Sequence, residues 1–163
     1  MCGIVAYIGS KPARELLLEG LKRLEYRGYD SAGLAVLNGK LRVARSEGRV
    51  SGLEEMVIHD PKFDGSIGIA HTRWATHGKP SERNAHPQSD DAKIGHGIQL
   101  VHNGIIENYT AIHQLLEYNG ITCQTETDTE VLVQFISYLY EKEKLSFAET
   151  VRLALKEVVG AYG

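Results

Sequence analysis

Short apolar runs and amphipathic segments alternate along the first part of the chain. Residues 4–8 (IVAYI) are apolar and rich in β-branched side chains, which predicts a buried strand. Leu17, Leu21 and Leu24 then recur at the spacing of a helix face, which predicts a helix over about residues 12–25. The chain is therefore expected to begin in the core and to continue directly into a helix.

A hairpin and a second helix are predicted next. Residues 33–45 form two β-rich runs joined by Asn38 and Gly39, the pair that best supplies the positive φ angles of a two-residue type I′ turn. Ser51 and Glu54 form a capping-box pattern ahead of a short amphipathic segment. We therefore expect a tight hairpin followed by a helix whose start Ser51 caps.

Two strand-like runs, residues 66–70 and 98–102, enclose a long polar stretch that contains Pro80 and Pro87. A loop of that length usually serves function. The remaining segments are predicted as a helix around residues 112–116, a strand over 121–125, helices after the capping boxes Thr127–Glu130 and Ser146–Glu149, and a β-rich end over 158–163. No glycine-rich nucleotide-binding motif follows the first strand, so the pattern predicts an α+β protein and leaves its sheet arrangement open.

Composition and charge narrow the class of protein. The chain has 163 residues, of which 42% are hydrophobic and 24% charged, as expected for one soluble domain with a good core. Its 18 basic and 21 acidic residues are interspersed, which argues against a nucleic-acid surface. The apolar stretches are far shorter than the roughly 18 to 20 residues needed to span a bilayer. With no signal peptide visible either, we expect a cytoplasmic protein.

The cysteines and histidines do not predict a disulfide framework or a metal site. Cys2 and Cys123 are the two cysteines, and neither belongs to a CxxC pair. His71, His77 and His86 form the densest histidine group, but their spacing is that of loops rather than the helical HExxH pattern. Cys123, in a predicted strand, is expected to be a small core residue.

Cys2 is a candidate nucleophile because of its place in the chain. Loss of Met1 would leave a cysteine that carries both a thiol and an α-amino group. An α-amino group has a pKa of roughly 7.7 to 8, so it can accept the thiol proton without a histidine partner. The alternative, a small residue at position 2 by chance, is favoured on this residue alone. Gly3, which permits close backbone approach, shifts the balance toward the nucleophile.

The segment HTRWATHG over residues 71–78 gathers polar groups after a predicted strand. Arg73 can bind a carboxylate in a bidentate fork, and Thr76 and His77 can add hydrogen bonds to the same anion. The alternative is a surface ion pair for Arg73 and a half-buried Trp74 at the edge of the core. The segment alone does not decide between the two.

Asn103 and Gly104 end a predicted strand, and Asp128 begins a predicted helix. Asn–Gly is an ordinary turn signal, but the Asn103 amide and the Gly104 N–H can also form an oxyanion hole. A carboxylate at the position of Asp128 stabilises a helix start, and it can equally hold a substrate ammonium group. On the sequence alone the turn is favoured for Asn103 and Gly104, and both alternatives stay open for Asp128.

The order of the motifs is more specific than any one of them. The motifs are MCGIV at the start, EYRGYDSAGLA over 25–35, HTRWATHGKP over 71–80, NAHPQ over 84–88, VHNGIIENY over 101–109 and TETDTE over 125–130. Over essentially its whole length the chain resembles the glutaminase domain, a class II glutamine amidotransferase, of the glucosamine-6-phosphate synthase family. YRGYD and HTRWATHG distinguish it from the amidophosphoribosyltransferases and asparagine synthetases.

The resemblance implies an N-terminal-nucleophile hydrolase fold, an αββα four-layer sandwich, with residues 1–163 forming a glutaminase domain incomplete at its C-terminal end. It implies the catalytic residues Cys2, Arg27, Asn103 and Gly104 and the substrate-binding residues Gly28, Arg73, Trp74, Thr76, His77 and Asp128. In these roles Cys2 is the nucleophile, Asn103 and Gly104 bind the oxyanion, and Arg27 and Gly28 shape the pocket. Arg73, Thr76 and His77 hold the substrate α-carboxylate, and Asp128 holds its α-ammonium.

The implied reaction is hydrolysis of L-glutamine to glutamate and ammonia, without a metal or an organic cofactor. In the full enzyme, expected to be a homo-oligomer, a sugar-phosphate isomerase domain would receive the ammonia and add it to fructose 6-phosphate to make glucosamine 6-phosphate. The alternative is a catalytically silent module that binds glutamine or supports assembly.

Overall fold

The computed structural model describes residues 2–27, 29–76, 78–90 and 96–163. The chain divides into two compact units. The first contains the residues up to Pro87 together with Val101–Asn103, and the second contains Gln88–Leu100 and Gly104–Gly163. Within the described ranges, no helix is both long and apolar enough to cross a membrane.

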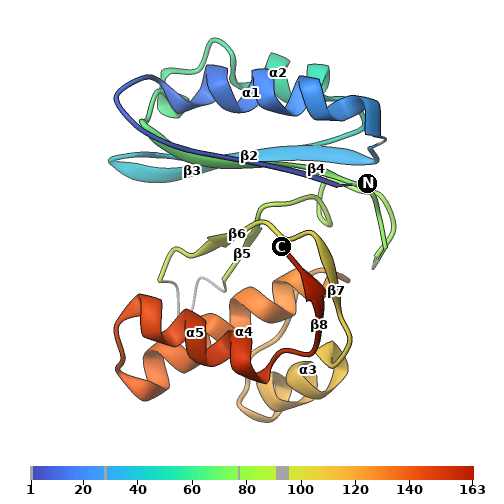
Figure 1. Cartoon of the computed structure of the whole chain (residues 1–163), viewed down its shortest axis with the longest axis vertical. Helices are drawn as coiled ribbons and strands as arrows, with labels where there is room; N and C mark the ends of the chain where they lie inside the picture. The colour runs from blue at the N-terminus through green and yellow to red at the C-terminus, as the bar shows by residue number, and fades with distance from the viewer. Residues whose placement is uncertain (1, 28, 77, 91–95) are drawn as a thin grey trace. The chain divides into compact units, whose positions relative to one another are not determined.

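In its described residues, the first unit has a four-stranded antiparallel sheet with two helices on one face (Figure 1). Its elements are β1 (Gly3–Ile8), α1 (Ala13–Leu24), the 3-10 turn η1 (Glu25–Arg27), β2 (Ser31–Asn38), β3 (Lys40–Glu47), α2 (Val50–Val57), the 3-10 turn η2 (Pro61–Phe63) and β4 (Ile67–Arg73). The strands lie in the order β1-β4-β2-β3, so β4 is an inner strand. Leu17, Leu21, Leu34 and Leu53 are fully buried in the core of this unit.

Residues 4–8 form a strand as predicted, but the prediction that it is buried was wrong. β1 lies at an edge of the sheet that the described residues form, and its Ile8 is 78% exposed. The first helix agrees with the leucine spacing, because Leu17 and Leu21 enter the core beneath α1.

The hairpin is present, but its turn is not the expected type I′. Leu37 pairs with Leu41, and Gly39 has a φ of +64°. Asn38 is not among the described residues with positive φ, although a type I′ turn needs positive φ at both central positions. In the register of the hairpin Asn38 pairs with Lys40, so Gly39 alone lies between the two strands, and its left-handed backbone suits a glycine.

The second helix begins earlier than the Ser51–Glu54 pattern predicted. α2 starts at Val50, its N-cap is Arg49, and no side chain of the N-cap bonds to the helix. The carboxylate of Glu25 accepts a hydrogen bond from the Val50 N–H at 2.9 Å. A carboxylate distant in sequence therefore satisfies the helix start in place of Ser51.

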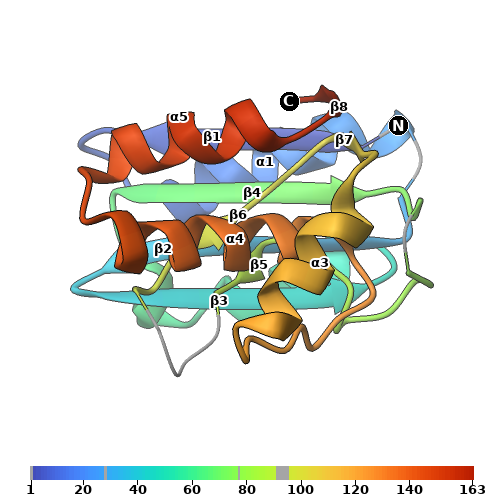
Figure 2. The same cartoon turned by 90° about the horizontal axis from the view of Figure 1, so that it is seen from below.

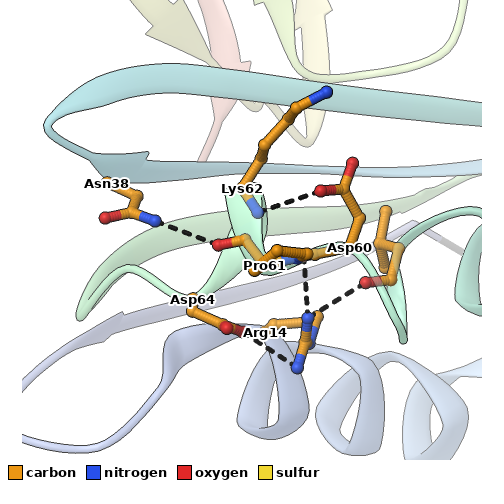
Figure 3. A network of polar contacts seen from close by, with 7 residues as sticks. Arg14, Asn38, Asp60, Pro61, Lys62 and Asp64 are labelled. Carbon is orange, nitrogen blue, oxygen red and sulfur yellow. Dashed lines mark hydrogen bonds and ion pairs between the residues drawn. The ribbon is translucent and has the colours of Figure 1, made fainter.

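Arg14 links α1 to the turn that contains η2 (Figure 3). Its Nη1 donates to the carbonyls of Val57 at 3.1 Å and Asp60 at 3.0 Å, and its Nη2 lies 2.9 Å from an oxygen of Asp64. Because the Arg14 side chain is largely buried, these bonds compensate the cost of removing a charged group from water. They hold the turn that precedes β4, the strand whose last three residues begin the HTRWATHG segment.

In its described residues, the second unit contains three helices and two short antiparallel strand pairs, as can be followed in Figure 2. Its elements are β5 (Gln88–Ser89), β6 (Gln99–Leu100), β7 (Gly104–Ile106), α3 (Tyr109–Tyr118), α4 (Asp128–Glu143), α5 (Phe147–Glu157) and β8 (Gly160–Tyr162). β5 pairs with β6, and β7 pairs with β8. Ile106, Leu116, Phe135 and Ala154 belong to its core.

Sequence predictions for this unit were right for the helices and less accurate for the strands. The capping box of Ser146 and Glu149 is formed, and Thr127 caps α4 by accepting from the Glu130 N–H. The strand predicted over 98–102 is reduced to β6, and residues 121–125 form no strand. In residues 121–125 the N–H groups of residues 124 and 125 donate to the carboxylate of Glu130. These two backbone groups therefore bond to a side chain of α4 instead of to a neighbouring strand.

Candidate active site

The pairing of β1 with β4 brings the start of the chain beside the segment that follows β4. Gly3 pairs with Thr72, so Cys2 lies next to the last residues of β4. The Trp74 N–H points to Cys2 Sγ, with N and S 3.1 Å apart, and Sγ lies 3.4 Å from the Trp74 carbonyl oxygen. These backbone contacts hold the thiol in a partly buried position.

Two side chains shape the loop after β4. Asp30 accepts a hydrogen bond from the Ala75 N–H at 2.6 Å, and its own N–H donates to the Arg73 carbonyl at 2.6 Å. Arg73 is only 4% exposed, and its Nη2 donates to the carbonyl of Gly78 at 3.0 Å. A guanidinium has five N–H donors in a fixed fork, which is the geometry that binds a carboxylate through two hydrogen bonds.

Both polar atoms of the Asn103 side-chain amide form hydrogen bonds within the first unit. Its Nδ2 donates to the carbonyl oxygen of Cys2 at 3.3 Å, and its Oδ1 lies 2.8 Å from Nε2 of His71. The Asn–Gly pair is therefore more than a turn signal, because the Asn103 amide nitrogen is directed at the candidate nucleophile residue.

His71 and His86 are buried and stack with ring centroids 4.4 Å apart. Burial is the main cause that lowers the pKa of His71 from 6.5 to about 4, and the nearby His102 and Arg73 act in the same direction. Burial also holds the pKa of His86 well below its ordinary value, with His71 and Arg73 adding to the shift. Both rings are therefore neutral near pH 7.

Gly104, in the second unit, has a structural reason to be glycine. Its φ is +136°, and a Cβ built on it would lie 2.2 Å from the carbonyl oxygen of Ala161 in β8. Any larger residue would disturb the pairing of β7 with β8. The glycine at this position is thus explained by the backbone, and its oxyanion role stays a prediction.

Asp128 is 4% exposed and is the first residue of α4. One of its carboxylate oxygens accepts from the Ile106 N–H at 3.0 Å, which ties the helix start to β7. A buried carboxylate at a helix N-terminus suits the helix dipole, and a carboxylate can also accept hydrogen bonds from an ammonium group. Both alternatives from the sequence remain compatible with this geometry.

The other predicted site residues are either exposed, located in the turn η1, or outside the described residues. Trp74 is 51% exposed, and Thr76 is exposed. Arg27 is the last residue of η1. Gly28 and His77 lie outside the described residues.

His71 and Asp30 are the polar residues of the site whose roles the sequence did not predict. His71 belonged only to a histidine group considered for metal binding. In the part of the chain that the structure describes, no group of three or more His, Cys, Asp or Glu side chains is placed to hold a metal ion. Cys123 packs partly buried against the second core, and burial raises its pKa to about 12, in agreement with an inert thiol.

A comparison with protein families identifies the chain. The family model described as "Glutamine amidotransferase domain" matches residues 52–146, more than half of the chain. The chain belongs to this family. A glutamine amidotransferase domain was the class that the motifs predicted, and this prediction is confirmed.

Two curated relatives carry the same name, glutamine–fructose-6-phosphate aminotransferase (isomerizing). The protein of Chlorobaculum tepidum is 52% identical over 166 residues, covering 100% of this chain. The protein of Bacteroides thetaiotaomicron is 49% identical over 164 residues, covering 99% of this chain. This chain spans only 26% of the length of each of these relatives.

Two solved structures share the fold of this amidotransferase domain. The glutamine phosphoribosylpyrophosphate amidotransferase of B. subtilis, complexed with ADP and GMP, aligns with a TM-score of 0.84 at 27% identity. A structure described as the allosteric regulatory enzyme of purine biosynthesis aligns with a TM-score of 0.85 at 28% identity. Each alignment covers 99% of this chain and 34% of the solved chain. The predicted N-terminal-nucleophile hydrolase fold of the α+β class is thereby confirmed.

Proposed function

We propose that this amidotransferase domain hydrolyses the side-chain amide of L-glutamine to glutamate and ammonia. The observation that carries the proposal is the cluster of Cys2, Trp74 and Asn103. A thiol held by the Trp74 backbone and an amide nitrogen directed at the same cysteine residue supply a nucleophile and an oxyanion donor.

The first chemical step is attack of the Cys2 sulfur on the amide carbon of glutamine. After loss of Met1, the α-amino group of Cys2 takes the thiol proton and passes it to the departing ammonia. Asn103 and the Gly104 N–H stabilise the tetrahedral oxyanion. Water then hydrolyses the γ-glutamyl thioester to glutamate and regenerates the thiol.

Substrate orientation depends on charged groups at the two ends of the amino acid moiety. Arg73 binds the α-carboxylate with the help of Thr76 and His77, and Asp128 binds the α-ammonium. Trp74 is a further substrate-binding residue. Arg27 and Gly28 shape the pocket around the nucleophile. The burial of Arg73 supports this assignment, because a guanidinium out of bulk water attracts a carboxylate more strongly.

The names of the curated relatives support a destination for the ammonia. In a full-length enzyme of that kind, a sugar-phosphate isomerase domain would add the ammonia to fructose 6-phosphate and form glucosamine 6-phosphate. Residues 1–163 would form the glutaminase domain, and we expect the full-length enzyme to be a cytoplasmic homo-oligomer.

The experiment is a glutaminase assay on the chain after mass spectrometry has verified loss of Met1. The parent and Cys123→Ala should release ammonia from glutamine, whereas Cys2→Ala should release none and still bind glutamine. Glutamine binding by a parent that shows no turnover would overturn the proposal in favour of a silent binding or assembly module. Activity that survives Cys2→Ala would remove Cys2 as the nucleophile.

A further inference from the structure

The bond between His71 and Asn103 links an inner strand of the sheet to the candidate oxyanion donor. His71 lies on β4 opposite Ile4 of β1 and Gly33 of β2, and its side chain is fully buried. Side chains alternate along a strand, and Ala70 faces the core beneath the helices, so His71 projects from the opposite face. There its Nε2 lies 2.8 Å from Asn103 Oδ1.

The chemistry of the neighbouring atoms fixes which way the Asn103 amide must point. The carbonyl oxygen of Cys2 can only accept a hydrogen bond, so the amide atom 3.3 Å from it must be the nitrogen. The amide oxygen therefore faces His71, and the ring nitrogen beside it must carry a hydrogen. A ring protonated at Nε2 and an amide nitrogen directed at Cys2 are the one combination that satisfies both bonds.

The surroundings hold the His71 ring in place. The His86 ring stacks on it with an interplanar angle of 36°. Gly33 allows this stacking, because a Cβ at that position would lie only 2.1 Å from the His86 carbonyl oxygen. The ring is thus packed between the sheet and the segment that contains His86, which limits its rotation.

We propose that His71 is a positioning residue that holds the Asn103 amide with its N–H donors turned toward the reacting carbonyl of glutamine. This inference rests on the proposed function. An amide nitrogen has two hydrogens, and the bond to Cys2 uses one, so the other can reach the oxyanion. An amide turned by half a rotation would present its oxygen to the developing negative charge and repel it.

The test compares two replacements of His71 in the full chain with a verified N-terminus. His71→Leu removes the donor, and His71→Gln places an amide N–H near the position of Nε2. His71→Leu should lower the glutaminase kcat about 10- to 100-fold, which is less than the ~10²- to 10³-fold cost of losing an oxyanion donor itself, and should change KM little. His71→Gln should recover most of the rate.

Two further readouts separate positioning from a general structural effect. In an Asn103→Ala background, His71→Leu should cause no additional loss of kcat, because the group it positions is already gone. Alkylation of Cys2 by iodoacetamide, in a Cys123→Ala background, should keep its rate, because this displacement forms no oxyanion. If His71→Leu does not fold, His71→Asn, whose amide is too short to reach Asn103, takes its place.

The outcomes distinguish this proposal from the proposed function. A parent chain that releases no ammonia overturns both. An active parent with His71→Leu at the parental kcat overturns only the role of His71. Equal losses from His71→Leu with and without Asn103 also overturn it, because the effect then does not pass through the amide.

Discussion

The buried histidines should make the first unit less stable as the pH falls from 7 to 5. The pKa of His71 is about 4 in the folded protein, against 6.5 when the ring is exposed to water. Between these pH values the unfolded chain binds a proton at His71 and the folded chain does not. The contribution of the neutral His71 ring to the free energy of unfolding is therefore complete above pH 6.5 and is lost as the pH falls toward 4.

The size of this loss in the free energy of unfolding follows from the size of the pKa shift of His71. The whole shift of His71 corresponds to about 3 kcal/mol, of which about 2 kcal/mol falls between pH 7 and pH 5. His86, whose pKa is also lowered, adds in the same direction. Glu141 and Glu149 have lowered pKa values and therefore change charge below this window.

Urea unfolding at pH 7 and pH 5, followed by the fluorescence of Trp74, measures this difference. Trp74 is the one tryptophan of the chain and lies in the same unit as His71. His71→Gln should reduce the difference between the two pH values by about 2 kcal/mol, whereas replacement of the exposed His59 by glutamine should not. An equal free energy of unfolding at both pH values, or a full difference in His71→Gln, would show that protonation of His71 is not the cause.

Three substitutions test other parts of the account. Asn103→Ala should lower kcat by about 10²- to 10³-fold with little change in glutamine affinity, since an oxyanion donor acts on charge that develops in the transition state; loss of affinity at constant kcat would make Asn103 a binding residue. Arg73→Lys should raise the KM for glutamine at least about tenfold in steady-state assays, because an ammonium cannot form a bidentate fork; an unchanged KM would count against the substrate orientation. Gly33→Ala should lower the free energy of unfolding by about 1–3 kcal/mol in a urea titration, because its Cβ meets the His86 backbone. Gly52→Ala is its control, since the nearest atom there is the movable hydroxyl of a serine, and an equal loss in both would show that close packing is not the cause.

Elements held by neighbours in sequence could be predicted from the sequence, and elements held by distant partners could not. The Ser146–Glu149 box caps α5 as its spacing indicates. The Ser51–Glu54 pattern failed because the carboxylate of Glu25, 25 residues before Val50, caps α2 instead. A capping pattern predicts a hydrogen bond between residues close in sequence, and a side chain distant in sequence can satisfy the same N–H group instead.

The candidate site shows the same division. Cys2 and Asn103 were found because each lies in a recognisable motif, and β-sheet register then explains how Cys2 comes to lie beside Trp74. The contact of His71 with Asn103 joins residues 32 positions apart through a buried bond. Nothing in the local pattern around His71 indicates that its partner is an asparagine rather than a metal ion.

The most direct test of the account is whether the α-amino group of Cys2 is required. Ammonia release from glutamine should be compared between preparations with Met1 removed and preparations that retain Met1 or a tag, each verified by mass. An added residue turns the amine into an amide that accepts no proton and fills the space beside the thiol. We predict activity only in the processed form, with both forms folded; full activity in the extended form would contradict the N-terminal-nucleophile mechanism.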